Sequence, residues 1–359
     1  MATGVGTILC MELTELEGYL ESSGEARFRA RQVFQWMHQR GVFDVDGMKN
    51  LPHALRDRLS EGGCGLPLEV VETRESTYDG ARKFVFRLED GNRIESVLIP
   101  ERDRLALCLS TQVGCAMGCS FCRTARMGLK RDLTAGEIVA QCYAVRDTLT
   151  AGRAITHVVF MGMGEPLANY SQTVRAIRIM AHPLGMGLSP RRITVSTLGI
   201  APAMEALLRE VQVNLTVSLN APDETLRTEL MPANRTHPLE EVIQALRRIR
   251  LPQRRRFTIA YVMLKGRNDT VMHASGLARR LHGIRCKINL IPFNPFPSSP
   301  LEASSEESVF KFQDMLRSKG FTTHVRVSKG RDILGACGQL ATLPERKARE
   351  RGYQCSCIM

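Results

Sequence analysis

The chain has 359 residues, of which 43% are hydrophobic and 24% are charged, and this length allows two domains or one large α/β domain with an appendage. Its formal net charge of +12 favours a polyanionic partner, nucleic acid ahead of anionic lipid, over a basic protein with no such partner. The N-terminus has no signal-peptide pattern and no apolar run approaches the ~20 residues of a membrane helix, so we expect a cytoplasmic protein with no membrane partner.

Residues 12–62 predict a small helical module. Apolar residues recur with helical spacing in RARQVFQWMHQR (29–40), and LPHALRDRLSEGG (51–63) has a proline near its start and paired glycines at its end. We expect Trp36, the only tryptophan, to pack between these helices. The prediction is an N-terminal, RNA-binding-like helical domain over 1–75, although a solvated face explains its arginines equally well.

A β-hairpin is predicted next, because residues 82–100 alternate apolar and polar side chains around the turn sequence EDGN. We place this hairpin in a linker over 76–100. A further strand at 104–111 leads directly into a cluster of cysteines.

From residue 101 onward, short β-branched and aromatic runs alternate with amphipathic helical patterns. The predicted strands are 104–111, 155–162, 191–199, 213–220, 256–264 and 286–293, and the helices are 171–182, 201–210, 239–250, 273–283 and 307–320. This order predicts parallel βαβ units and an α/β fold, a partial (β/α)6 barrel over 101–345 followed by a tail over 346–359. Chemistry in such barrels lies at the carboxyl ends of the strands.

The stretch GCAMGCSFCRTA (114–125) places Cys115, Cys119 and Cys122 directly after the first barrel strand. In a chain expected in the cytoplasm, clustered cysteines are metal ligands or redox thiols rather than disulfides. A structural zinc site needs a fourth ligand, and no second ligand pair follows. Three thiolates on a [4Fe–4S] cluster leave one iron free, which is how radical enzymes bind S-adenosylmethionine.

Polar residues lie at the ends of later strands. Glu165, in MGMGEPLAN (161–169), can accept hydrogen bonds from the ammonium group of S-adenosylmethionine. Ser196, Ser218 and Asn294 hold similar positions, and turn capping is the alternative explanation for all three.

Three further residues are candidates for chemistry. Cys108, on the first barrel strand, and Cys337, in a glycine-flanked loop after the last one, are thiol nucleophiles or small buried residues. Glu95, on a strand leading toward the site, is a general base or an exposed hairpin carboxylate.

Long ordered blocks give the chain a strong resemblance to the RlmN/Cfr family of radical S-adenosylmethionine RNA methyltransferases, in the branch that methylates carbon 2 of adenine. The blocks span nearly the whole chain and include FRARQVFQWMHQRGV, IESVLIPERDRLALCLSTQVGCAMGCSFC, VVFMGMGEPLAN, RRITVSTLGI, CKINLIPFNPF and FTTHVRVSKGRDILGACGQLA. The resemblance implies a radical S-adenosylmethionine barrel acting on 23S rRNA near the peptidyl-transferase centre and on tRNA beside the anticodon.

The resemblance also implies roles for individual residues. Cys115, Cys119 and Cys122 would bind the cluster, and Cys337 would be methylated and then joined to the adenine. Cys108 would attack the Cys337 sulfur to release the product, and Glu95 would remove a proton. Contacts to S-adenosylmethionine are implied for Gly164, Glu165, Ser196, Ser218, Leu219, Asn220 and Asn294.

Some features depart from the family pattern or leave alternatives open. Asn220 stands where many relatives have histidine, which puts any role that needs an imidazole in doubt. The basic run 247–257 suits either phosphate contact or a solvated helix end. We expect a monomer that receives electrons from a flavodoxin or a ferredoxin. Cys355 and Cys357, in the tail, bind metal or are inert. The competing functions are methylation of carbon 8 and a non-catalytic zinc or RNA-binding protein.

Overall fold

A computed structural model of the chain describes residues 8–61, 64–297 and 299–342. Within this part, one ten-stranded sheet forms the centre of the molecule, with the strand order β1-β2-β3-β4-β7-β8-β9-β10-β11-β12. Its strands are β1 (Leu68–Glu75), β2 (Arg82–Leu88), β3 (Arg93–Glu101), β4 (Arg104–Cys108), β7 (His157–Phe160), β8 (Ile193–Thr197), β9 (Asn214–Ser218), β10 (Phe257–Met263), β11 (Cys286–Pro292) and β12 (Thr322–Val325).

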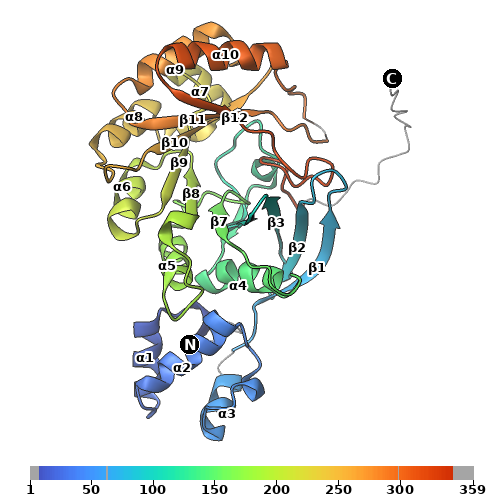
Figure 1. Ribbon diagram of the computed structural model, residues 1–359, viewed down its shortest axis with the longest axis vertical. Coiled ribbons are helices and arrows are strands. Elements are labelled where there is room, and N and C mark those ends of the chain that lie inside the picture. The colour runs from blue at the N-terminus through green and yellow to red at the C-terminus, as the bar shows by residue number, and fades with distance from the viewer. Residues whose placement is uncertain (1–7, 62–63, 298, 343–359) are drawn as a thin grey trace.

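In this sheet the strands β4, β7, β8, β9, β10, β11 and β12 are parallel, and helices cover their outer face (Figure 1). These helices are α4 (Ala135–Arg146), α5 (Tyr170–Ala181), α6 (Ala201–Glu210), α7 (Glu224–Leu230), α8 (Leu239–Arg248), α9 (Val271–Leu281) and α10 (Glu306–Ser318). Aliphatic side chains of the strands and of the inner helix faces form one continuous core. The α/β fold of parallel βα units predicted from the sequence is confirmed.

The predicted hairpin is present as β2 and β3, but it belongs to the large sheet. β3 pairs antiparallel with β4, and β1 pairs antiparallel with β2. Residues 68–75 are therefore a strand of this sheet, whereas the sequence reading placed them in the helical module. The pattern was missed because β1 exposes nearly all of its side chains after Leu68 and shows no alternation.

The N-terminal module lies at one end of the barrel (Figure 1) and consists of α1 (Leu13–Ser22), α2 (Phe28–Phe34), the π-helix η2 (Gln35–Arg40) and α3 (His53–Glu61). It contacts α4 through His38, whose Nδ1 lies 2.7 Å from the hydroxyl of Tyr143. Arg175 of α5 forms an ion pair with Glu15 at 2.8 Å. Trp36 is only partly buried, and the guanidinium carbon of Arg40 lies over its ring, 4.1 Å from the ring centroid.

The segment 326–342, which follows β12, crosses to the opposite edge of the sheet. The backbone N–H of Gly330 donates to Asp79 in the β1–β2 turn at 2.8 Å, and the N–H of Ala341 donates to Glu95 on β3 at 2.9 Å. Thr342 donates to the carbonyl of Arg93 at 3.2 Å. This segment, which carries Cys337, therefore closes the gap between β12 and the hairpin strands (Figure 1).

Among the described residues, none of the helices has the length and apolar character needed to cross a membrane. The predicted tail 346–359, with Cys355 and Cys357, lies outside the described residues.

Candidate active site

A separate two-stranded sheet frames the loop that carries the three cysteines. β5 (Gln112–Gly114) enters the loop and β6 (Leu129–Asp132) leaves it, and the N–H of Cys115 donates to the carbonyl of Gly128 at 2.9 Å. Gly114 has a φ of +81°, and a Cβ there would lie 1.8 Å from the Gly128 oxygen. Only glycine fits this close crossing of two backbones, so Gly114 fixes the shape of the loop.

The three thiols lie close enough to influence one another. Burial, with a smaller contribution from the neighbouring Cys122, raises the pKa of Cys115 to about 12. Burial also raises the pKa of Cys119 well above its usual value, with contributions from Cys122 and Cys115. Such thiols stay protonated unless a metal takes the place of the proton.

The donor set of this loop is three thiols, the ligand type of iron–sulfur clusters. A zinc ion needs its ligands around one point, whereas a [4Fe–4S] cluster binds each thiolate through a different iron. Cys115, Cys119 and Cys122 are therefore suited to hold the cluster.

The loop after β7 brings Gly164 and Glu165 next to the cysteine loop. The carboxylate of Glu165 accepts from the N–H of Leu198 at 2.9 Å and from that of Leu167 at 3.1 Å. Burial raises its pKa to about 6 despite these hydrogen bonds. Gly164 has a φ of +102°, and a Cβ there would lie 2.6 Å from the side chain of Gln112. The result is a buried carboxylate at the carboxyl end of a strand.

Ser196 and Ser218 lie at the ends of β8 and β9 and are both half-buried. In β8 the half-buried positions alternate with the fully buried Val195 and Thr197, so Ser196 faces away from the helices. Register places Ser196 beside Thr216 and places Ser218 beside Ala260. Both hydroxyls therefore lie where a ligand in the barrel could contact them.

The side chains of Asn220 and Asn294 are occupied by protein partners. Asn220, at a φ of 58°, accepts from the N–H of Val262 at 2.8 Å. The amide of Asn294 donates to the carbonyl of Cys337 and to Ser328, both at 3.0 Å. In this structure Asn294 thus holds the loop that carries Cys337.

Cys108 and Cys337 come from distant parts of the chain and lie near each other. Cys108 is buried at the end of β4, whereas Cys337 is exposed. Burial raises the pKa of Cys108, and Cys337 is the next cause of the increase. Surrounding protein also raises the pKa of Cys337, and Cys122 contributes. Cys337 therefore lies within electrostatic range of both Cys108 and Cys122 of the cysteine loop.

Glu95 is buried rather than exposed, so the alternative of a solvated hairpin carboxylate is wrong. Its Oε1 lies 3.2 Å from Nζ of Lys83, and each of these two side chains is only 5% exposed. Burial raises the pKa of Glu95, and Lys83 opposes that increase. Lys83 was missed by sequence reasoning, although hairpin register makes it a diagonal neighbour of Glu95.

Gln141 of α4 was also missed. Its amide oxygen accepts from the hydroxyl of Ser96 at 2.6 Å and from the N–H of Ser110 at 2.9 Å. The Ser110 hydroxyl in turn donates to the carbonyl of Glu95 at 2.6 Å. This buried network fixes β3 against the start of the cysteine loop, and no spacing in the sequence indicates it.

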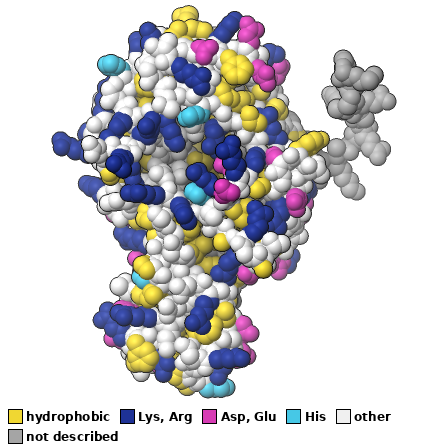
Figure 2. Space-filling view, in the orientation of Figure 1, with side chains coloured by type: hydrophobic (Ala, Val, Ile, Leu, Met, Phe, Trp, Pro, Cys, Tyr) yellow, Lys and Arg dark blue, Asp and Glu magenta, His cyan; other side chains and the backbone are white. Residues whose placement is uncertain are grey.

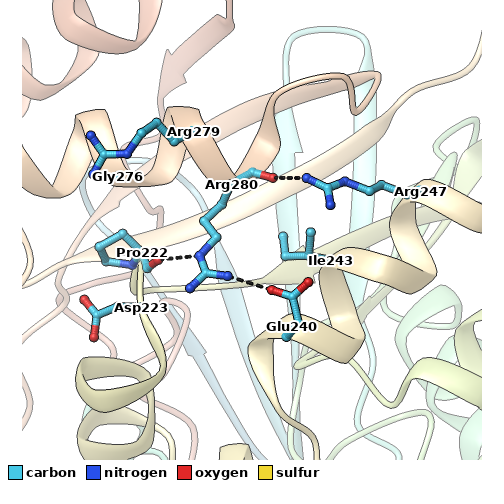
Figure 3. A pocket seen from close by; sticks show the side chains of 8 residues that line it. All are labelled: Pro222, Asp223, Glu240, Ile243, Arg247, Gly276, Arg279 and Arg280. Carbon is cyan, nitrogen blue, oxygen red and sulfur yellow. Dashed lines mark hydrogen bonds and ion pairs between the residues drawn. The ribbon is translucent and has the colours of Figure 1, made fainter.

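Lys and Arg side chains cover much of the face shown in Figure 2. Part of the predicted basic run 247–257 serves the fold, because Arg248 pairs with Glu205 at 2.7 Å and Arg255 donates to the Val213 carbonyl at 3.2 Å. Arg247 lines a pocket between α8 and α9 with Arg279 and Arg280 (Figure 3). Arg280 forms an ion pair there with Glu240, so this pocket is only partly free to bind an anion.

A parallel barrel with three cysteines on the loop after its first parallel strand defines a radical S-adenosylmethionine enzyme. The family model described as the radical SAM superfamily matches residues 109–274, which contain this loop. A second model, described as the ribosomal RNA large subunit methyltransferase N-terminal domain, matches residues 7–64. The barrel and the N-terminal helical module therefore each match a family model.

Relatives with the same organisation identify the family. The chain is 47% identical to a dual-specificity RNA methyltransferase RlmN from Syntrophus aciditrophicus, over 92% of this chain and 95% of the relative. It is 49% identical to the protein of that name from Syntrophobacter fumaroxidans, over 91% and 96%. A crystal structure of a radical SAM methyltransferase from Sphaerobacter thermophilus superposes with a TM-score of 0.89 at 45% identity, covering 94% of this chain and 99% of that one. The chain belongs to the RlmN family, whose cofactors are a [4Fe–4S] cluster and S-adenosylmethionine.

Proposed function

We propose that this protein methylates carbon 2 of adenine in 23S rRNA and in tRNA. The observation that carries the proposal is that the loop of Cys337 contacts the cysteine loop, where the N–H of Arg123 donates to the carbonyl of Gly338 at 2.7 Å, and that Cys108 lies within electrostatic range of Cys337. Relatives named dual-specificity RNA methyltransferase RlmN, 44–49% identical to this chain, support the choice of substrates. Action on these RNAs supports a cytoplasmic location, which is part of the proposal.

Each candidate residue has a part in the proposed reaction. The bound cofactors supply the methyl groups and the carbon radical that an unactivated aromatic carbon requires. Cys337 carries the methyl-derived carbon and becomes joined through it to the adenine. Glu95 accepts a proton, for which its raised pKa suits it. The Cys108 thiolate then attacks the Cys337 sulfur: an S–S bond forms, the S–C bond breaks with its electron pair staying on the adenine side, and the leaving carbon takes up a proton to become the methyl group of the released RNA.

The remaining contacts follow from the site. We assign Gly164, Glu165, Ser196, Ser218, Leu219, Asn220 and Asn294 to the S-adenosylmethionine site, with Asn220 and Asn294 acting through the backbone that they hold. The N-terminal helical module, the hairpin strands and the barrel act together, and β1 (Leu68–Glu75) belongs to the sheet rather than to the helical module. The protein is proposed to act as a monomer that takes electrons from a flavodoxin or a ferredoxin.

The experiment is nucleoside mass spectrometry after reaction without oxygen. The cluster-loaded protein is incubated with reductant, S-adenosylmethionine and either unmodified 23S rRNA fragments or tRNA. We expect 2-methyladenosine in both RNAs and its complete loss in Cys337→Ala. In Cys108→Ala we expect RNA that stays attached to the protein, because the resolving thiol is missing. Cys286→Ala, which removes a buried cysteine at the far end of β11, is the control and should remain active.

Two results would contradict the proposal. If the product is 8-methyladenosine, the proposed cysteine-linked route stands but methylation at carbon 2 is wrong. Product formation by Cys337→Ala at the wild-type rate would exclude the cysteine-linked route.

A further inference from the structure

Arg227, in α7, is the largest fully buried side chain among the described residues. Its guanidinium donates to the carbonyls of Leu198, of Leu219 at 3.2 Å and of His237 at 3.0 Å, and to the side chain of Asn234. The planar, five-donor guanidinium suits such a set of fixed acceptors, which the single ammonium of lysine cannot satisfy.

The acceptors belong to the backbone that shapes the proposed S-adenosylmethionine site. Leu198 directly follows β8, and its N–H donates to the carboxylate of Glu165. Leu219 directly follows β9, between the proposed contact residues Ser218 and Asn220. Arg227 therefore links the carboxyl ends of the neighbouring strands β8 and β9 through its hydrogen bonds to Leu198 and Leu219.

The guanidinium of Arg227 donates to carbonyl and amide oxygens, and the carboxylate of Glu224 is connected to it through Asn234, whose amide donates to Glu224 at 2.7 Å. Burial lowers its pKa to about 10, so the group is still a cation at neutral pH. A buried cation is costly, and a carboxylate connected to it only through an intervening amide offsets that cost in part, so a further negative group nearby would stabilise it.

The cysteine loop can supply this negative charge. Ser120, next to Cys119, donates through its N–H to the carbonyl of Leu230 at 2.9 Å, so the loop rests on the last turn of α7. Glu224 and, to a smaller extent, Cys119 counteract the lowering of the Arg227 pKa, which places Cys119 within electrostatic range of Arg227. When the thiolates hold a cluster, the net charge beside Arg227 is negative, and it becomes more negative when the cluster accepts an electron.

We propose that Arg227 is a positioning residue that holds the ends of β8 and β9 in the shape that binds S-adenosylmethionine, and that its charge favours the reduced state of the cluster. The inference rests on the cofactor site of the proposed function and does not depend on the RNA substrate.

The test compares two variants. Arg227→Lys keeps the positive charge but loses the planar set of guanidinium donors, and Arg227→Gln loses both. Arg285→Gln is the matched control, because Arg285 also donates to several backbone carbonyls, those of Gln253, Leu251 and Pro252, in a loop at the opposite ends of the strands. For each cluster-loaded protein, the reduction potential is measured by anaerobic titration followed by electron paramagnetic resonance. The dissociation constant for S-adenosylmethionine is measured separately.

Distinct results are expected for the three variants. Arg227→Gln should lower the equilibrium constant for cluster reduction about tenfold, a shift of about 59 mV to more negative potential. Arg227→Lys should keep the wild-type potential but bind S-adenosylmethionine about tenfold more weakly. Arg285→Gln should change neither quantity.

The proposal is overturned if Arg227→Lys binds S-adenosylmethionine as well as wild type does, or if its potential shifts as far as a lost charge requires. Both measurements remain decisive if Arg227→Gln does not fold. Neither uses RNA, so a failed methylation assay with a normal Arg227 result would reject the substrate assignment alone.

Discussion

The two thiols proposed for the reaction, Cys108 and Cys337, both have a raised pKa, and they differ in exposure. Because the thiolate is the reactive form, an exposed cysteine with a raised pKa reacts slowly at neutral pH. We predict that iodoacetamide modifies Cys337 about tenfold faster for each pH unit, through and beyond pH 9. The measurement is peptide mass spectrometry of the protein after timed labelling.

Glutathione under the same conditions is the control for the labelling of Cys337, because its thiol titrates without a protein environment. Labelling that levels off below pH 9 would show that a nearby group stabilises the thiolate. The role of Cys337 as a protonated resting thiol would then be wrong.

Glu165 provides a second titration at the residue scale. Its pKa is raised to about 6 by burial, so the carboxyl becomes neutral as the pH falls through 6. If it binds the ammonium group of S-adenosylmethionine, affinity should fall about tenfold from pH 7 to pH 5. Isothermal titration calorimetry of the cluster-loaded protein measures this change. Glu165→Gln should bind weakly at both pH values, and a pH-dependent affinity in that variant would assign the effect to another group.

The positions of the site residues could be predicted from the sequence. The contacts that their side chains make could not. Glu165, Ser196 and Ser218 lie at the strand ends where βα periodicity placed them. Asn294 was expected to contact a ligand, yet its amide binds Cys337 and Ser328. Such contacts join residues far apart in the chain, and local pattern carries no information about them.

At the scale of elements, the cysteine loop depends on one backbone crossing. A methyl group at Gly114 would meet the Gly128 oxygen at 1.8 Å, and the φ of +81° is itself unfavourable for alanine. We predict that Gly114→Ala separates β5 from β6, and that the reconstituted protein holds less than about a tenth of the wild-type iron. Iron and sulfide analysis measures the loss, and circular dichroism checks that the barrel remains folded.

Gly91→Ala is the control for Gly114→Ala. Gly91 has a similar φ of +78° in the turn between β2 and β3, and a Cβ there meets nothing within 4 Å. It should lower stability by only about 1 kcal/mol and leave the iron content unchanged. Equal iron loss in both variants would mean that the backbone conformation, rather than the clash, disrupts the loop.

Helix α4 shows why some elements escape sequence analysis. Every residue from Ala135 to Val145 is buried, because β-strands, α5 and the N-terminal module surround the helix. A helix buried on all sides has no polar face and therefore no 3.6-residue alternation to detect. The amphipathic helices α5 and α8, each with one solvated face, were predicted within a few residues of their bounds.

At the scale of the whole molecule, segment 326–342 brings the last part of the chain to the first strands of the sheet. The same segment carries Cys337 and begins at Arg326, whose exposed side chain lies 3.4 Å from Glu101 on β3. Arg326 also lowers the pKa of Cys337, so it lies within electrostatic range of the proposed reactive thiol. RNA that places an adenine at Cys337 would therefore pass close to Arg326.

The net charge of +12 predicts that RNA affinity falls steeply with salt, and Arg326 should contribute to this dependence. We predict that Arg326→Gln reduces the slope of log binding constant against log salt by about 0.7–0.9, the value for one lost phosphate contact. Filter binding of tRNA at several salt concentrations measures the slope. Arg279→Gln, an exposed arginine in the outer pocket between α8 and α9, should leave it unchanged. The reverse result would place the RNA on the outer face of the barrel, away from Cys337.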